Sequence, residues 1–333
     1  MVDPDDSTGG TGPSNGSDAG PSDGPDSGRS GGTDTPPAAD PSGGDDPTPS
    51  AVTLPPDLLG RYRRFSLYNS PYAAHDEGHA VDLYPDPGAA PSPVAGEVLD
   101  VRSVSAPPKP YAEAEDHLIL IRVADGVVDA REGLVARVLH ADPAVEPGEW
   151  VAAGEDLGRT IRSGFFAPWV GDHLHVGFRP PDGNHYRASG SLPVAAGVSV
   201  DPLPWDGRGT VVERGDTYAV LDRPVHPAPG DRWAGIATDG GGVLDGGFPH
   251  YDGGGILPDG DPPDGEVTAV ELLGTGIGTA TGRTVEWADR TVRANGEAVT
   301  GLSLSLGRDR AGAKLVCPDA TFEVGTEVRV RIE

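Results

Sequence analysis

The sequence has a single cysteine, Cys317, in 333 residues. One thiol excludes an internal disulfide and any metal site built from several cysteines. Lysine is almost as scarce, because Lys109 and Lys314 are the only lysines among 25 basic residues. Aromatic residues make up 6% of the chain and apolar residues 36%, and these low shares indicate that part of the chain packs no core.

Long hydrophobic runs and basic surface are also missing. No run approaches about 18 apolar residues, so no helix is expected to span a membrane. The first residues, from Met1 to Asp6, have neither the positive charge nor the apolar stretch of a secretory signal, which favours a cytoplasmic location. The chain has 52 acidic residues and a net charge of −27, whereas a nucleic-acid binder needs a basic footprint, so nucleic-acid binding is excluded.

The large excess of acid with so little lysine resembles the proteins of extreme halophiles. Carboxylates keep a protein surface hydrated, and their repulsion is tolerable because the Debye length falls to about 3 Å at 1 M salt. An acidic surface suited to a basic ligand is the alternative. The acids are spread along the whole chain, which favours the solvent interpretation.

Residues 1–55 are predicted to be a disordered acidic tail. The first 50 residues contain ten aspartates, one arginine, eleven glycines, nine prolines, eight serines and no aromatic residue. Such a segment has almost nothing to bury, so the entropy cost of ordering it is not offset. A solubilising leader is the favoured role, and a spacer is the alternative.

Two β-rich domains are predicted after the tail, over residues 56–205 and 206–333. Short apolar runs of four to eight residues, rich in Val, Leu and Ile and separated by Gly and Pro, predict an all-β fold. In the first domain they are Ala80–Tyr84, Gly96–Val101, His117–Val123, Leu134–His140, Trp150–Ala153 and His173–Phe178. In the second they are Gly209–Leu221, Glu266–Leu273, Thr284–Val292, Leu302–Leu306 and Thr321–Ile332. Asn295-Gly296 predicts a type I′ hairpin turn.

Two glycine-rich stretches of the second domain are not predicted to be sites. Gly274–Gly278 follows an apolar strand, but no helix pattern follows it, so a dinucleotide site is excluded. Leu244–Gly254 is expected to be a plain glycine-rich loop rather than a ligand or cation site.

Five of the nine histidines lie in three short clusters in the first domain. In the last cluster, strand alternation places His173 and His175 on one face, with Leu174 and Val176 pointing into the core. This spacing lets one imidazole bind a metal while the other reaches a metal-bound water or the substrate. Two surface histidines on a strand are the alternative interpretation.

The first cluster supplies a histidine and Asp82. Burying Asp82 within an apolar strand would be costly without a partner, and a carboxylate with two imidazoles suits zinc and leaves a fourth position for water. The alternative is a turn aspartate with scattered histidines. Both His75 and His79 remain open as the ligand: a strand from His79 to Tyr84 would turn His79 away from Asp82, but a strand that begins later would not orient it.

The middle cluster contains His140, at the end of a predicted strand, followed by tight turns over residues 146–158. By themselves these turns also fit a lipoyl- or biotin-carrier domain. A carrier needs a lysine at a hairpin tip, and neither lysine of the chain lies near these turns. The carrier interpretation is therefore excluded.

Together, the three clusters and the proline-then-glycine stretch at residues 90–98 resemble the LytM/lysostaphin-type zinc metallopeptidases over about residues 70–180. The resemblance implies a lysostaphin-type antiparallel β-sheet domain. It implies Asp82 and His175 as zinc ligands, His173 as the catalytic histidine, and His140 as its partner in binding water and substrate.

The first ligand departs from that family. The lysostaphin-type spacing places a histidine where Gly78 stands. The pattern His-x-x-Gly-x-Ala-x-Asp over His75–Asp82 is closer to the related D-alanyl-D-alanine carboxypeptidases and hedgehog proteins. That likeness favours His75 as the third ligand, with His79 as the alternative.

The resemblance also implies an activity, a substrate class and a location. The family hydrolyses peptide cross-links of murein by zinc-activated water in the cell envelope, which implies a peptide or glycopeptide substrate here. A halophilic archaeal host would lack murein, and its substrate would then be another peptide or glycoprotein. A non-catalytic binding or regulatory module that keeps the fold is the alternative, and the complete set of His, Asp and His-x-His favours the enzyme.

Overall fold

The computed structural model describes residues 51–333, except 125, 127, 129–131 and 258–266. Nearly all of the predicted tail therefore lies outside the described residues. Its last five residues are described, and three of them form strand β1 (Val52–Leu54), which pairs in parallel with β11 (Val194–Ala196).

The fold is all-β, as the sequence predicts. In the described residues the only helices are two single turns, α1 (Pro56–Leu59) and α2 (Ala73–Asp76). None of the described helices has the length and apolar character needed to cross a membrane. Strands of two to nine residues form the rest of the regular structure, because Gly and Pro interrupt the apolar runs at short intervals.

The site described below lies in a sheet of ten strands, in which all neighbours are antiparallel except β12 and β15. In spatial order the strands are β12 (Val200–Leu203), β15 (Trp233–Ile236), β24 (Leu306–Gly307), β2 (Arg64–Ser66), β3 (Val81–Tyr84), β10 (Leu174–Arg179), β6 (Val135–Leu139), β5 (Asp116–Val123), β4 (Gly96–Val104) and β8 (Trp150–Val151). The six runs predicted for the first domain correspond to β3, β4, β5, β6, β8 and β10.

A second sheet has twelve strands, and a two-stranded sheet joins β7 (Ala141–Pro143) to β9 (Gly158–Thr160). In spatial order the twelve are β18 (Val267–Leu272), β19 (Thr275–Thr281), β20 (Thr284–Trp287), β17 (Gly253–Leu257), β16 (Val243–Phe248), β23 (Gly301–Leu304), β25 (Lys314–Val316), β14 (Tyr218–Leu221), β13 (Arg208–Arg214), β26 (Glu327–Ile332), β21 (Val292–Ala294) and β22 (Glu297–Val299).

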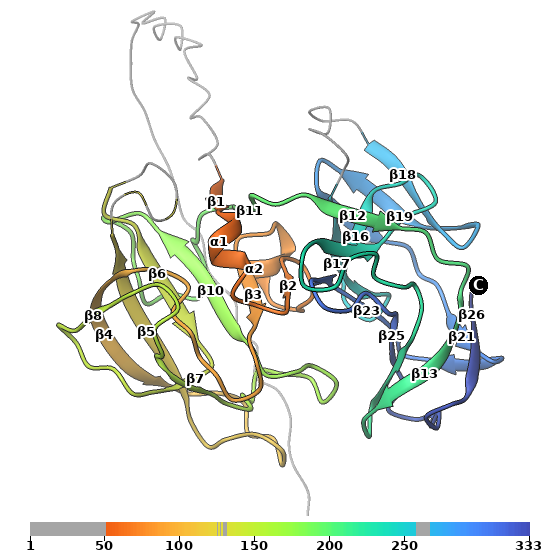
Figure 1. The fold of residues 1–333 in the computed structure, drawn as a ribbon, viewed down its shortest axis with the longest axis horizontal. Helices are drawn as coiled ribbons and strands as arrows, with labels where there is room; N and C mark the ends of the chain where they lie inside the picture. Colours follow the sequence, from red (N-terminus) through yellow and green to blue (C-terminus); the bar gives the residue numbers. More distant parts are fainter. Residues whose placement is uncertain (1–50, 125, 127, 129–131, 258–266) are drawn as a thin grey trace, which may run out of the picture. The chain divides into compact units, whose positions relative to one another are not determined.

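The centre of the ten-stranded sheet is formed by β2, β3, β10 and β6, which lie side by side (Figure 1). Leu174 and Val176 are fully buried in the core below them, as alternation along β10 predicts. Their neighbours on the strand point to the opposite face. One face of β10 therefore packs on the core while the other carries the polar site.

Strands from beyond residue 205 complete this sheet. β24 pairs with β2, and β15 pairs with β24. Trp233 of β15 packs its ring edge-on against Phe65 of β2, with 4.8 Å between centroids, and belongs to the same buried core. The C-terminal part of the chain is thus built into the sheet that carries the site.

Several strand predictions in the second domain need correction. The run 209–221 is two strands, β13 and β14, because Gly215 and its neighbours turn the chain between them. The run 284–292 is likewise divided between β20 and β21, and the run 321–332 is a strand only from residue 327 onward. The run 302–306 contributes β23 to one sheet and β24 to the other.

Two turn predictions have opposite outcomes. Asn295 and Gly296 both have positive φ, 52° and 90°, between β21 and β22, so the type I′ turn is confirmed. The loop predicted over Leu244–Gly254 is wrong, because these residues form most of a hairpin of β16 and β17. Glycines at paired positions leave space there for neighbouring rings: a Cβ on Gly254 would lie 2.1 Å from the Trp287 ring.

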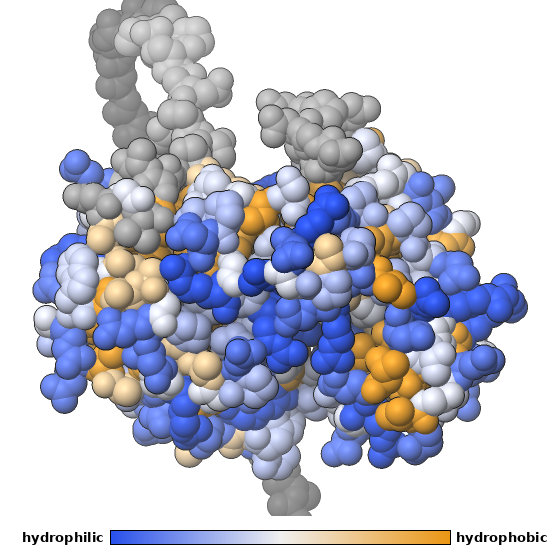
Figure 2. Space-filling model, viewed as in Figure 1, coloured by the Kyte–Doolittle hydropathy of each residue, from blue (hydrophilic) through white to orange (hydrophobic). Residues whose placement is uncertain are grey.

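The face of the molecule shown in Figure 2 is mostly hydrophilic, with hydrophobic residues in small separate patches. Residues 51–333 carry 18 of the 27 net negative charges, since residues 1–50 carry nine. The hydrophilic face agrees with the acid-rich composition.

Candidate metal centre

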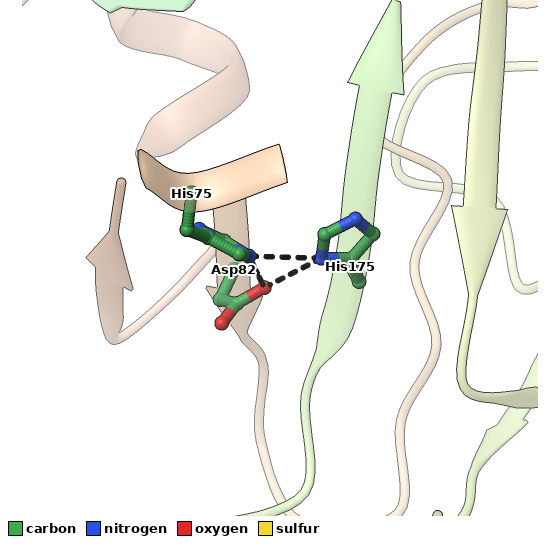
Figure 3. A group of neighbouring side chains, drawn as sticks. All are labelled: His75, Asp82 and His175. Carbon is green, nitrogen blue, oxygen red and sulfur yellow. Dashed lines mark hydrogen bonds and ion pairs between the residues drawn. The ribbon is translucent and has the colours of Figure 1, made fainter. Parts of the chain in front are cut away.

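Three side chains from three different elements converge on one point (Figure 3). His75 lies on α2, Asp82 on β3 and His175 on β10. His75 Nε2 is 3.2 Å from Asp82 Oδ1, His175 Nδ1 is 3.0 Å from the same oxygen, and the two nitrogens are 3.0 Å apart. The three atoms form a nearly equilateral triangle.

The sheet register places two of the three. β3 and β10 are antiparallel neighbours with Asp82 directly opposite His175, so their side chains leave the sheet on the same face. Leu83 and Leu174 are paired in the next position and are buried in the core. Alternation therefore separates the polar pair from the apolar one.

His75 reaches the site through a tight turn. It stands at the end of the single helical turn α2, and Gly78, with φ of 67°, turns the chain back into β3. A Cβ on Gly78 would lie 2.8 Å from the Tyr68 hydroxyl oxygen. The positive φ and this contact favour glycine over a histidine at position 78, where the lysostaphin-type spacing would place a histidine.

The orientation of the His75 ring is set by a main-chain carbonyl. Its Nδ1–H donates a hydrogen bond of 2.7 Å to Leu67 O. In the neutral ring, Nε2 then carries the lone pair, and it is Nε2 that faces Asp82 and His175. A histidine held this way by an outer partner is typical of metal ligands.

The geometry of the triangle fits a metal ion. In a tetrahedral zinc site with bonds of about 2.0–2.1 Å, neighbouring ligand atoms lie about 3.3 Å apart, close to the 3.0–3.2 Å separations seen here. A carboxylate oxygen and imidazole lone pairs repel one another at this distance unless a proton or a cation lies between them. His75, Asp82 and His175 could therefore hold a metal ion.

The protonation states favour a cation. Burial opposes the charge of Asp82, but the neighbouring His173 and His75 rings outweigh it and hold the Asp82 pKa well below its usual range. Burial lowers the pKa of His175 to about 4 and leaves its ring neutral near pH 7. For His75, burial also opposes the charge, but Asp82 and the Leu67 carbonyl raise the pKa above its ordinary value. An ionised Asp82 beside a neutral His175 can bind a metal ion, and at His75 a metal ion competes with a proton for Nε2.

His173 and His140 lie beside this group. His173 directly precedes β10, and its Nδ1–H donates 2.9 Å to Gly171 O, which leaves Nε2 facing Asp82 Oδ2 at 3.4 Å. The His140 ring centroid is 5.4 Å from that of His173 and 5.9 Å from that of His175. The structure thus brings together five predicted residues, His75, Asp82, His140, His173 and His175.

The sixth predicted residue, His79, does not join the group. β3 begins at Val81, so His79 precedes the strand and alternation does not orient its side chain. Its Nε2 instead lies 3.4 Å from Glu77 Oε2. Of the two histidines left open by the sequence, the structure places His75 next to Asp82.

Sequence reasoning missed Asp116, which lies behind His140. Asp116 is 1% exposed. Its Oδ2 accepts a hydrogen bond of 2.6 Å from His140 Nδ1–H and another from the Ser163 hydroxyl. Its Oδ1 accepts from the backbone N–H of His117 at 2.7 Å and of His140 at 3.1 Å. These bonds outweigh burial and lower the Asp116 pKa. An acid opening an otherwise apolar strand was the signal in the sequence.

An aromatic wall beside the two flanking histidines was also missed. The Phe166 ring stacks on His173 at 4.3 Å and meets His140 edge-on at 4.7 Å. Tyr72 Oη donates 3.1 Å to Phe165 O, and Tyr111 Oη donates 2.9 Å to Phe166 O. Two tyrosines from separate loops therefore hold the segment that covers one side of His140 and His173.

Comparison with protein families gives two matches. Residues 53–196 match the N-terminal domain of DUF8155, and residues 201–333 match its C-terminal domain, both described as domains of unknown function. The metal-capable group and its flanking histidines all fall in the first match. A comparison with curated proteins finds no match. The two matches follow one another and span nearly all the described residues, so the chain belongs to the DUF8155 family and carries both of its domains.

Proposed function

We propose that this protein is a zinc-dependent hydrolase of peptide bonds, similar in its site to the LytM/lysostaphin-type metallopeptidases. The observation that carries the proposal is the 3.0–3.2 Å triangle of His75, Asp82 and His175, with two further histidines beside it. Three protein ligands with an open fourth position are characteristic of catalytic rather than structural zinc sites.

Zinc suits the donor set better than Mg²⁺ or Ca²⁺ does. Two imidazole nitrogens and one carboxylate oxygen are borderline ligands, whereas Mg²⁺ and Ca²⁺ prefer oxygen ligands alone. The side chain of His175 is 16% exposed, against 1% for His75 and 3% for Asp82, so His175 is the most exposed of the three. When bound, a zinc ion supplies a Lewis acid that polarises a carbonyl and lowers the pKa of a coordinated water to about 7.

His140 and His173 are the proton-transfer groups in this proposal. Each donates Nδ1–H to a protein oxygen, so in the neutral ring Nε2 carries the lone pair. Either can accept a proton from the attacking water and return it to the leaving amine. Asp116 holds His140 in this tautomer and stabilises the imidazolium formed when it takes the proton.

The substrate class follows from the resemblance to the metallopeptidases. A peptide or a glycopeptide is the expected substrate, and murein is its form if the host makes murein. The non-catalytic alternative keeps the fold and the metal-capable group but hydrolyses nothing.

The test has two stages. Protein purified in high salt without chelator is assayed for bound metal, and one zinc per chain is expected. Zinc-loaded protein is then incubated with a mixed peptide library and with murein fragments, and new termini are identified by mass spectrometry. Absence of zinc would overturn the proposal, whereas stoichiometric zinc without hydrolysis would favour a binding module.

A further inference from the structure

One buried carboxylate of the C-terminal domain, that of Asp245, contacts the segment next to the candidate metal centre. Asp245 lies on β16, in the stretch expected from the sequence to be a plain loop, and is fully buried. Both of its oxygens are occupied: Oδ1 accepts 2.6 Å from the Ser66 hydroxyl, and Oδ2 accepts 2.6 Å from Leu67 N–H. Asp245 therefore holds the last residue of β2 and the residue after it, and is not itself placed as a ligand.

Leu67 links Asp245 to His75. Leu67 receives Asp245 at its N–H and offers its C=O to His75 Nδ1–H, at 2.6 Å and 2.7 Å respectively. Ser66, the second residue held by Asp245, is paired with Asp82 across β2 and β3. One carboxylate thus anchors the segment that orients one histidine of the group and flanks the strand of its acid.

The contacts around Asp245 reinforce this arrangement. β24 pairs with β2 on its other side, and Asn69 Nδ2 donates to Ser303 Oγ at 2.9 Å and to Leu304 O at 3.0 Å. The segment 64–69 is therefore held along its length by the C-terminal domain. Of these contacts, the hydrogen bond accepted by Asp245 is made by Leu67, whose carbonyl accepts from His75 Nδ1–H.

We propose that Asp245 is a positioning residue of the metal centre, which fixes the His75 ring through Leu67. The inference rests on the proposed zinc site and assigns the C-terminal domain a role in it: this domain completes the outer shell of a centre whose three ligands all come from the N-terminal domain. Without Asp245, the Leu67 N–H loses its partner, and the Leu67 carbonyl no longer fixes the orientation of the His75 ring.

The experiment compares Asp245→Asn, Asp245→Ala and Ser66→Ala with Ser303→Ala in the full chain. Ser303→Ala is the matched control, because it removes a polar contact to the same segment but not the link to His75. Zinc affinity is measured by chelator competition, and the site geometry by the visible absorption of the Co²⁺-loaded protein. Outer-shell changes typically weaken metal binding about 10–100-fold.

A loss in that range with an altered Co²⁺ spectrum is expected for both Asp245 variants, with a smaller loss for Ser66→Ala. Ser303→Ala should keep the parent affinity and spectrum. Folding is checked by circular dichroism, and Ser66→Ala serves as the milder variant if Asp245→Ala does not fold. Parent affinity and spectrum in folded Asp245→Asn and Ser66→Ala would overturn the inference.

A second readout separates this inference from the proposed function. In metal-free protein, ¹⁵N NMR of the His75 ring reports its tautomer, and the parent is expected to be Nδ1–H. Mixed tautomers in the Asp245 variants support the positioning role even if the parent binds no zinc, a result that would overturn the zinc proposal alone. An unchanged Nδ1–H tautomer in all variants would overturn the positioning role.

Discussion

Two buried aspartates, one in each domain, show how surroundings decide what a carboxylate does. Asp82 and Asp245 are 2% and 0% exposed. Asp82 faces three imidazole rings within 3.4 Å, whereas Asp245 faces a hydroxyl and a main-chain N–H. The neighbouring rings hold the pKa of Asp82 well below its usual range, while burial raises the pKa of Asp245 to about 6.

The difference lies in the partners, since burial is nearly the same. Groups that can carry positive charge favour the ionised form of Asp82, whereas neutral donors compensate only part of the desolvation of Asp245. The first carboxylate could bind a cation, and the second holds a side-chain hydroxyl and a main-chain N–H. Perturbed groups of the first kind, in a cluster with an open position, are typical of functional sites.

The largest expected effect is loss of the metal. Asp82→Ala and His175→Ala each remove one of the three ligands and should abolish stoichiometric zinc binding. In the parent, zinc at 1,000 times its dissociation constant should add about 4 kcal/mol to the free energy of unfolding, and this gain should vanish in both variants. Calorimetry with and without zinc measures it. If zinc still increased the free energy of unfolding of Asp82→Ala, Asp82 would not be a ligand of the metal ion.

The next effect concerns the histidines that flank Asp82. His140→Ala, His173→Ala and Asp116→Asn should keep one zinc per chain and lose hydrolysis. Positioned general acid–base groups typically contribute 10²–10⁴-fold, so rates should fall by about this factor in the two histidine variants. Metal analysis and peptide cleavage are measured on the same samples. Loss of zinc in His173→Ala would instead make His173 a ligand.

The pKa of Asp245 predicts a pH-dependent contribution to stability. Its folded pKa of about 6 lies above the ordinary value of 3.8, so the folded state holds a proton that the unfolded state has released between these values. The stabilisation that comes from protonating Asp245 in the folded state is complete below about pH 4 and is lost as the pH rises through about 6. A shift of about two pKa units corresponds to about 3 kcal/mol.

The difference in the free energy of unfolding between the metal-free parent and Asp245→Asn should therefore change between about pH 4 and pH 6. Asparagine does not titrate, so the parent should gain on the variant as pH falls from about 6 to 4. Denaturant unfolding at several pH values measures the difference. A constant difference across the window would contradict the contrast between the two aspartates.

His75 and His79, the two histidines of the first cluster, should differ in their effect on zinc binding. His75→Ala should lose zinc, whereas His79→Ala should retain it, because His79 Nε2 contacts Glu77 rather than Asp82. Because His79 is partly exposed, with 28% of its side chain accessible, His79→Ala should change the free energy of unfolding by less than about 0.5 kcal/mol. Zinc stoichiometry of the two variants decides between them, and the reverse result would make His79 the ligand.

The smallest effect is expected at the N-terminus. Deleting residues 1–50 should leave the melting temperature nearly unchanged, because a segment with almost no apolar residues contributes no packing. Thermal unfolding of the full and shortened chains, at the same salt concentration, measures this. A fall of several degrees would show that the segment docks on the rest of the protein.

Local patterns predicted the elements of the first domain well and those of the second domain less well. Each run of the first domain corresponds to one strand within a few residues. The run 302–306 does not, because β23 and β24 follow one another with a single residue, Ser305, between them but belong to different sheets. Periodicity reports that residues alternate, and it contains no information about which sheet they join.

The sequence by itself determined the all-β class, the type I′ turn at Asn295-Gly296 and the identity of the histidines and the acid that meet in the first domain. The fold class and the turn follow from alternation and turn chemistry within short segments, whereas the grouping of the histidines with the acid also rested on the resemblance to the LytM/lysostaphin-type metallopeptidases. Tertiary structure alone decided that His75 rather than His79 lies beside Asp82, that Asp116 holds His140, and that Asp245 reaches Leu67 from 178 residues away. The physical reason is that a hydrogen bond between buried groups depends on their separation in space, and strand pairing sets that separation only once both sheets have formed.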